Sequence, residues 1–254
     1  MKLFKKPLAF FLSFFLLIFS LTPLTVSANS SKQSAINYVS LGDSLAAGIT
    51  PYKSIGPGYP HYLTELLKSQ GNVNPSYFGV PGYTSSDVIQ DLTDPSRPNH
   101  NPMKKALRKA HIVTIDIGAI DVLAKMQAGQ QITHADIKNT VNNVAKILVI
   151  IKTINPKAKV YVMGYYNPFP HPNSLYAPYV PTLLYALQQY NQSVEVIASF
   201  MNVTFVPTAH LVQANYVNYL PNPNDIHLSA EGYQAIADAF FNAIKSNQTS
   251  LVNK

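Results

Sequence analysis

Cysteine and tryptophan are both absent from this chain of 254 residues. Without cysteine, neither a disulfide nor a thiolate metal site can form. Charge is also scarce, because only 12% of the residues are Asp, Glu, Lys or Arg whereas 47% are hydrophobic. This composition supplies enough apolar side chains for one sizeable core, and the length favours one domain or at most two.

The first thirty residues have the pattern of a secretory signal peptide. Three lysines at positions 2, 5 and 6 precede an apolar run from about Leu8 to Leu21, and the small residues at 26–28 suit a signal-peptidase site. The alternative is an uncleaved membrane anchor, but the run is short for a span and Pro23 breaks it. We therefore predict a signal peptide over residues 1–28 and a single mature domain over residues 29–254.

The excess of basic residues is small and scattered. The formal net charge of +7 falls to +4 without the three lysines of the signal peptide, which favours only a weak attraction to an anionic envelope surface. The one basic cluster, KKALRK at 104–109, is typical of a solvated helix face, so nucleic-acid binding is not indicated. Export without disulfides fits a bacterial source better than a eukaryotic one. We expect a secreted or cell-envelope-associated bacterial protein.

Segments typical of strands and of helices alternate from residue 36 to the end of the chain. Buried strands are predicted at 36–41, 75–80, 111–117, 159–163 and 203–206. Helices are predicted at 59–70, 132–154, 180–201 and 229–245, with a shorter one opened by Ser85 or Ser86 and with Thr133 and Ser229 as candidate caps. Helices between strands predict parallel crossovers. The fold class is therefore α/β, a three-layer α/β/α sandwich around a parallel five-stranded sheet.

Two stretches, 94–102 and 167–179, are rich in Pro and Asn and are predicted to be irregular. The second also carries aromatic residues. It either borders a substrate cleft or is an ordinary surface loop.

Ser44 follows the first predicted strand, at the edge of the sheet where open α/β proteins bind their ligands. A serine at a sharp turn between strand and helix can expose its hydroxyl, with backbone N–H groups aimed at the same point. Taken alone, Asp43-Ser44 is more often a helix cap than a nucleophile.

Asp225 and His227 stand just before the last predicted helix. A carboxylate this close to an imidazole can orient it, and the two can then act as an acid–base pair. No other histidine has a comparable neighbour: His61, His100, His111, His134, His171 and His210 are set aside. A parallel sheet can bring a serine near the start of the chain together with a histidine near its end.

Four ordered blocks resemble the GDSL, or SGNH, hydrolase family. They are GDSL at 42–45, GVPGYTS at 79–85 with its glycine at Gly82, TIDIGAID at 114–121 and DIH at 225–227. The resemblance runs from about Tyr38 to the end of the last helix. It implies a flavodoxin-like α/β/α fold and hydrolysis of carboxylic esters without a metal or other cofactor.

The same resemblance implies the role of each candidate residue. Ser44 is the nucleophile, His227 is the general base that activates it, and Asp225 orients His227. The oxyanion hole would consist of the backbone N–H groups of Ser44 and Gly82 and of a side chain from the third block.

Two positions depart from the family pattern. The acid usually stands three residues before the histidine, where this chain has Asn224, whereas Asp225 stands two before it. We take Asp225 as the orienting group, with Asn224 or a backbone carbonyl as the alternatives. Ile120, in the turn predicted after the third strand, replaces the asparagine that donates to the oxyanion.

Isoleucine donates no hydrogen bond. The loss of one such donor costs about 10²–10³ in turnover, roughly 3 to 4 kcal/mol, while two backbone donors would remain. Ile120 therefore predicts a slow esterase before it predicts an inert protein. An Asn or Tyr from residues 165–179 could supply the missing donor.

The leading hypothesis is a secreted esterase or lipase-like hydrolase that acts on small acyl esters, lipids or acetylated envelope sugars. The alternative is a protein that kept the fold, lost the chemistry and binds envelope lipid or glycan. A phosphate- or nucleotide-binding protein is a distant third, because the segment after the first strand lacks the glycine spacing and the lysine of a phosphate-binding loop.

Overall fold

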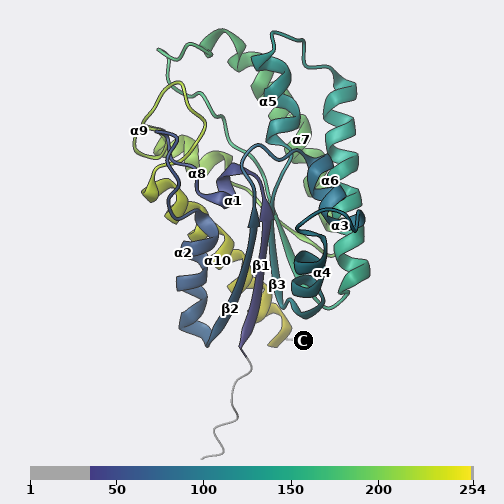
Figure 1. Cartoon of the computed structure of the whole chain (residues 1–254). Coiled ribbons are helices and arrows are strands. Elements are labelled where there is room, and N and C mark those ends of the chain that lie inside the picture. The colour runs from purple at the N-terminus through teal and green to yellow at the C-terminus, as the bar shows by residue number, and fades with distance from the viewer. Residues whose placement is uncertain (1–34, 253–254) are drawn as a thin grey trace, which may run out of the picture. The chain divides into compact units, whose positions relative to one another are not determined.

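Five strands form one parallel sheet, and its three central strands consist mostly of buried residues (Figure 1). The computed structural model describes residues 35–252. The strands lie in the order β2-β1-β3-β4-β5 and span Ile36–Gly42 (β1), Val73–Gly79 (β2), Ile112–Asp116 (β3), Lys159–Met163 (β4) and Thr204–Val206 (β5). The order changes direction at β1, and a ligand crevice is expected where β1 and β3 end side by side.

Helices cover both faces of the sheet, which confirms the predicted α/β/α fold (Figure 1). On one face α2 packs against α10, and on the other α6 packs against α3, α4 and α7. The long elements are α2 (Tyr59–Leu67), α3 (Ser85–Thr93), α4 (His100–Lys109), α6 (His134–Ile154), α7 (Val180–Phe200) and α10 (Ala230–Val252). The remaining helices are α1 (Ser44–Ala47), α5 (Ala119–Gln127), α8 (Ala209–Ala214) and α9 (Tyr216–Tyr219), with 3₁₀ turns at Lys68–Gln70 and Ala177–Tyr179.

The helix α6 shows how local sequence sets an element's limits. Thr133 and Asp136 form a reciprocal capping box at its start, as the Thr133 cap predicted. Ile137, Val144 and Ile151 lie on its buried face. At its other end Asn155 donates hydrogen bonds of 2.9 Å from its side-chain amide to the carbonyl groups of Leu107 and Ala110, which ties α6 to the end of α4.

Three local predictions differ from the structure. Residues 100–102, predicted as irregular, form the first turn of α4, where Pro102 is tolerated because the first N–H groups of a helix have no partner within the helix. β2 begins at Val73 and includes Pro75, because β2 is an edge strand. Ile120 is not in a turn, since α5 begins at Ala119 after Gly118, whose φ is +115°.

The predicted signal peptide, residues 1–28, lies outside the described residues. None of the helices between residues 35 and 252 is long and apolar enough to cross a membrane.

Candidate active site

The site is assembled where β1, β2 and β3 end. In the sheet register Gly42 lies beside Gly79 on one side and beside Asp116 on the other. A Cβ on Gly42 would lie 2.2 Å from an oxygen of Asp116, so only glycine allows the three segments to approach this closely. The next residue, Asp43, caps α1 by accepting a 3.0 Å hydrogen bond from the N–H of Leu45, and Ser44 opens the helix.

Ser44, His227 and Asp225 form a continuous hydrogen-bonded line. Nε2 of His227 lies 2.9 Å from Oγ of Ser44, and Nδ1 lies 2.6 Å from Oδ1 of Asp225. The same carboxylate oxygen accepts a 2.9 Å hydrogen bond from the backbone N–H of His227. Ser44 and His227 are 183 positions apart in the sequence, and His227 and Asp225 are 2 apart. The fold brings the three residues into the geometry of a nucleophile, a base and an orienting acid.

Asp225 is held in its ionised form. Burial alone would raise its pKa, but hydrogen bonds from the side chain and backbone of His227 more than offset this, and electrostatic attraction to His227 and Lys53 lowers the pKa as well. The pKa of Asp225 therefore lies below its ordinary value. An ionised carboxylate at this position stabilises an imidazolium during catalysis.

The side-chain oxygen of Asn224 is engaged away from His227. It accepts a 2.8 Å hydrogen bond from the backbone N–H of Leu175. The loop is further fixed by Tyr166, whose hydroxyl donates a 3.0 Å hydrogen bond to the carbonyl of Ile226. Of the alternatives open in the sequence, the structure places Asp225 against the imidazole.

The backbone N–H groups near the serine differ in whether they have an acceptor. Leu45 and Ala46 donate their N–H groups to the carboxylates of Asp43 and Asp116. For the N–H groups of Ser44 and Gly82, in contrast, we find no acceptor among residues 35–252. Gly82 is exposed and has a φ of +81°, a backbone conformation that favours glycine.

The first turn of α5 carries Ile120 and Asp121. Ile120 is half-buried and has no polar atom in its side chain. Asp121 accepts hydrogen bonds from the backbone N–H and the hydroxyl of Ser85, at 2.8 and 2.5 Å, and so joins the start of α5 to the start of α3. Asn143 donates to the same hydroxyl at 2.9 Å. Asp121 therefore fixes the segment that follows Gly82.

Two buried carboxyl groups lie beneath the nucleophile. Asp43 accepts a hydrogen bond from the hydroxyl of Tyr165 at 3.1 Å, and Asp116 accepts one from the hydroxyl of Tyr59 at 2.7 Å. Burial raises the pKa of Asp43 from 3.8 to about 6. Burial and the neighbouring charge of Asp43 raise the pKa of Asp116 well above its ordinary value. Since each carboxyl group shifts the pKa of the other, we expect the pair to share one proton, which resides on Asp116.

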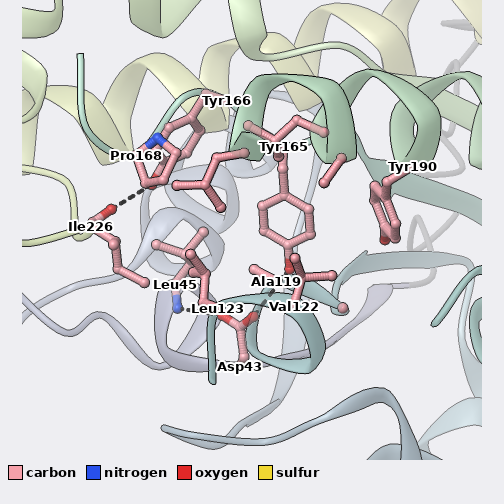
Figure 2. A pocket seen from close by; sticks show the side chains of 14 residues that line it. Asp43, Leu45, Ala119, Val122, Leu123, Tyr165, Tyr166, Pro168, Tyr190 and Ile226 are labelled. Atoms are coloured by element: carbon pink, nitrogen blue, oxygen red, sulfur yellow. Dashed lines mark hydrogen bonds between the residues drawn. The ribbon is translucent and has the colours of Figure 1, made fainter. Parts of the chain in front are cut away.

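A mostly apolar cavity lies close to the site (Figure 2). Its lining includes Asp43 and Leu45, which flank Ser44 in the sequence, and Ile226, which precedes His227. Its walls come from α5, from α7 and from the chain after β4. The lining residues are Asp43, Leu45, Gly118, Ala119, Val122, Leu123, Tyr165, Tyr166, Pro168, Leu183, Ala186, Leu187, Tyr190 and Ile226.

Sequence reasoning missed Asp116 and Asp121 as site residues, and it considered Tyr165 only among the possible oxyanion donors. Asp116 stands in the third predicted strand, and a carboxylate inside an otherwise apolar strand was the signal that could have identified it. For Asp121 the signal was its place as the acidic residue of the third family block. The contact of Tyr165 with Asp43 had no signal in the sequence.

An α/β/α fold with a serine, a histidine and an aspartate in line at the carboxyl edge of its sheet has the arrangement of a serine-dependent hydrolase. Residues 40–235 match the GDSL-like lipase/acylhydrolase family, and the chain belongs to that family of carboxylic ester hydrolases. The resemblance predicted from the sequence blocks is confirmed. No curated protein matches the chain.

Solved structures show the same fold. A lipase from a goat rumen metagenome matches with a TM-score of 0.67 and 19% identity over 82% of this chain and 97% of that one. A putative GDSL-like lipase from Parabacteroides merdae matches with a TM-score of 0.61 and 16% identity over 84% and 96%. Axe2, an acetylxylan esterase from Geobacillus stearothermophilus, matches with a TM-score of 0.59 and 18% identity over 81% and 92%.

Proposed function

We propose that this protein hydrolyses carboxylic esters with Ser44 as the nucleophile, His227 as the general base and Asp225 as the group that orients His227. The observation that carries the proposal is the line of hydrogen bonds from Ser44 Oγ through the imidazole to the Asp225 carboxylate, at 2.9 and 2.6 Å. No metal or other cofactor is needed for this chemistry.

The first half of the reaction forms an acyl-enzyme. Ser44 Oγ attacks the ester carbonyl carbon while its proton passes to Nε2 of His227. The carbonyl oxygen becomes an oxyanion that the N–H groups of Ser44 and Gly82 stabilise. The intermediate then collapses, the bond to the alcohol oxygen breaks, and the imidazolium gives its proton to the leaving alcohol.

The second half repeats these steps with water. Nε2 of His227 takes a proton from a water molecule, whose oxygen attacks the acyl carbon. The proton returns to Ser44 Oγ as the acid leaves. Throughout both halves the ionised Asp225 holds Nδ1 as a donor, so that Nε2 is the nitrogen that exchanges protons.

The turnover is expected to be slow because Ile120 supplies no third oxyanion donor. Two of the candidate donors at 165–179 are not free to act. The hydroxyl groups of Tyr165 and Tyr166 are already engaged, with Asp43 and with the carbonyl of Ile226. The same observation favours a second candidate function, a catalytically impaired protein that binds envelope lipid or glycan.

Hydrolysis of a short-chain p-nitrophenyl ester by the wild type, Ser44→Ala and Ile120→Asn separates the two. We expect measurable turnover in the wild type, none above background in Ser44→Ala, and a gain of ten-fold or more in Ile120→Asn. Wild-type activity equal to that of Ser44→Ala, together with no gain in Ile120→Asn, would refute the esterase and leave the binding protein.

We propose in addition that the protein is exported and acts outside the cytoplasm, in the medium or in peripheral association with the envelope. The signal-peptide pattern of residues 1–28 supports this proposal. Fractionation of cells that express the full chain, with sequencing of the mature amino terminus, tests this. A protein retained in the cytoplasm with its amino-terminal segment intact would contradict it.

A further inference from the structure

We propose that Arg97 is a positioning residue for the oxyanion hole, because it holds, through Tyr83, the turn that presents the backbone N–H of Gly82. The inference rests on the proposed ester hydrolysis and goes beyond it. It gives a role in the reaction to the segment at 94–99, which the sequence indicates only as irregular chain. Arg97 acts through other residues and not on the reacting atoms.

The type of turn decides which way the N–H of Gly82 faces. The N–H of Tyr83 donates to the carbonyl of Val80 at 3.2 Å, which closes a four-residue turn. Pro81 is its second residue, and Gly82, the third, has a φ of +81°. These are the features of a type II β-turn. In a type I turn the peptide between the second and third residues is turned over, so the N–H of Gly82 would face the opposite way.

The two ends of this turn are fixed by different parts of the molecule. At its start, the N–H of Val80 donates to the carbonyl of Gly42 at 3.1 Å, two residues before Ser44. At its end, the hydroxyl of Tyr83 accepts a 3.2 Å hydrogen bond from Nη2 of Arg97. The guanidinium carbon lies 5.7 Å from the centroid of the Tyr83 ring, within the range of a cation–π attraction. The turn is therefore held between the nucleophile strand and Arg97.

Arg97 is itself fixed by a buried carboxylate. Its Nε donates at 2.8 Å to Oδ1 of Asp91, whose side chain is 0% exposed. The side-chain amide of Asn99 donates to the other oxygen of Asp91 at 2.9 Å. The planar fork of an arginine can reach Asp91 and Tyr83 at the same time, whereas the single ammonium group of a lysine cannot. The link from α3 to the turn thus requires arginine at this position.

The test compares Arg97→Lys with Tyr83→Phe, because both remove the same link. Lysine keeps a positive charge for Asp91 and loses the bond to Tyr83, whereas Phe keeps the ring and loses the hydroxyl. We expect both variants to fold, as thermal unfolding checks, since Asp91 stays paired. Each should lower kcat for p-nitrophenyl butyrate by about 5- to 100-fold, less than or near the cost of a missing oxyanion donor. KM should stay within about twofold, because the oxyanion forms only on the way to the intermediate.

A double variant and a matched control separate positioning from other roles. The Arg97→Lys/Tyr83→Phe double variant should have a kcat within about twofold of either single variant, because one link is broken only once. Arg108→Lys makes the same change in an exposed arginine of α4 and should leave kcat unchanged. A fall in kcat of less than about fivefold in Tyr83→Phe would mean that Arg97 serves only Asp91, and it would overturn the proposal. A KM raised beyond about twofold would mean that Tyr83 contacts the substrate, and it would overturn the proposal as well.

A measurement without substrate keeps the inference testable if the wild type hydrolyses no ester. The backbone amide signal of Gly82 is followed by ¹⁵N NMR in the wild type, Arg97→Lys and Tyr83→Phe. It should shift or broaden in both variants, while the signal of Gly71, which stands before the other end of β2, stays unchanged. Such a change supports the link to the turn even though the proposed hydrolysis has failed. An unchanged Gly82 signal in both variants overturns it.

Discussion

Replacing Asp116 by Asn tests whether the two carboxyl groups beneath Ser44 share a proton. Asn resembles a protonated carboxyl group, because its amide can donate to Asp43 while its oxygen accepts from the N–H of Ala46. The hydroxyl of Tyr59, which would lose its acceptor, lies 3.3 Å from Thr114 Oγ1 and can turn to it. We therefore expect the variant to fold.

The pKa values set the sign of the effect. Both carboxyl groups have pKa values above those of the unfolded chain, so the folded state binds more protons. The stability they contribute is complete below about pH 4 and is lost as the pH rises through the folded pKa values. Moving the pKa of Asp43 from 3.8 to about 6 corresponds to about 3 kcal/mol. Deprotonation of Asp116 lowers the free energy of unfolding by up to about 1.4 kcal/mol more for each unit of pH increase.

The assay is urea unfolding of the wild type and Asp116→Asn between pH 5 and 7. The wild type should lose more stability over this range than the variant, by about 1 kcal/mol or more. Asp238→Asn is the control, because Asp238 is an exposed carboxylate of α10 and its removal should leave the wild-type curve unchanged in shape. If the unfolding free energies of Asp116→Asn and the wild type change in parallel with pH, proton sharing is refuted.

Four further substitutions follow from the site and the core. Asp225→Asn should lower kcat by roughly 10³- to 10⁴-fold, whereas Asn224→Ala, which loses only its bond to the loop, should keep most activity in the same ester assay. Asp121→Ala should lower kcat and leave the overall fold intact, as checked by circular dichroism, because it frees Ser85 and the segment after Gly82. Ile147→Ala, in the buried face of α6, should cost about 2–5 kcal/mol in urea unfolding.

Most of the fold could be predicted from the sequence. The spacing of apolar residues and the residues that begin or end each helix and strand indicate the same elements. The fourth strand matches its predicted limits, and α6 begins two residues later than predicted, at the capping box of Thr133. The first turn of α4 was missed for a physical reason. Pro102 and the prolines before it are typical of irregular chain, but the start of a helix tolerates proline as well.

The candidate site was predictable only in part. Ser44 and His227 stand out because each occupies a chain segment that a parallel sheet carries to the same edge. The choice between Asp225 and Asn224 needed the loop conformation, which hydrogen bonds to residues 49 or more positions away decide. The mutual shift of the pKa values of Asp43 and Asp116 also depends on the approach of segments far apart in sequence.

The consequence of Ile120 depends on Asp121. Asp121 fixes the first turn of α5 to Ser85 whatever residue stands at position 120, so Ile120→Asn should place an amide near the oxyanion without moving the helix. If this holds, the gain from Ile120→Asn should shrink in an Asp121→Ala background. A double-mutant cycle on kcat/KM measures the coupling, and we expect an interaction of about 0.5–3 kcal/mol. Purely additive effects would mean that Asp121 does not position the turn. If the two effects are coupled, residue 120 lacks only a hydrogen-bond donor and the rest of the site is in place. A single substitution, Ile120→Asn, then reverses the loss of turnover.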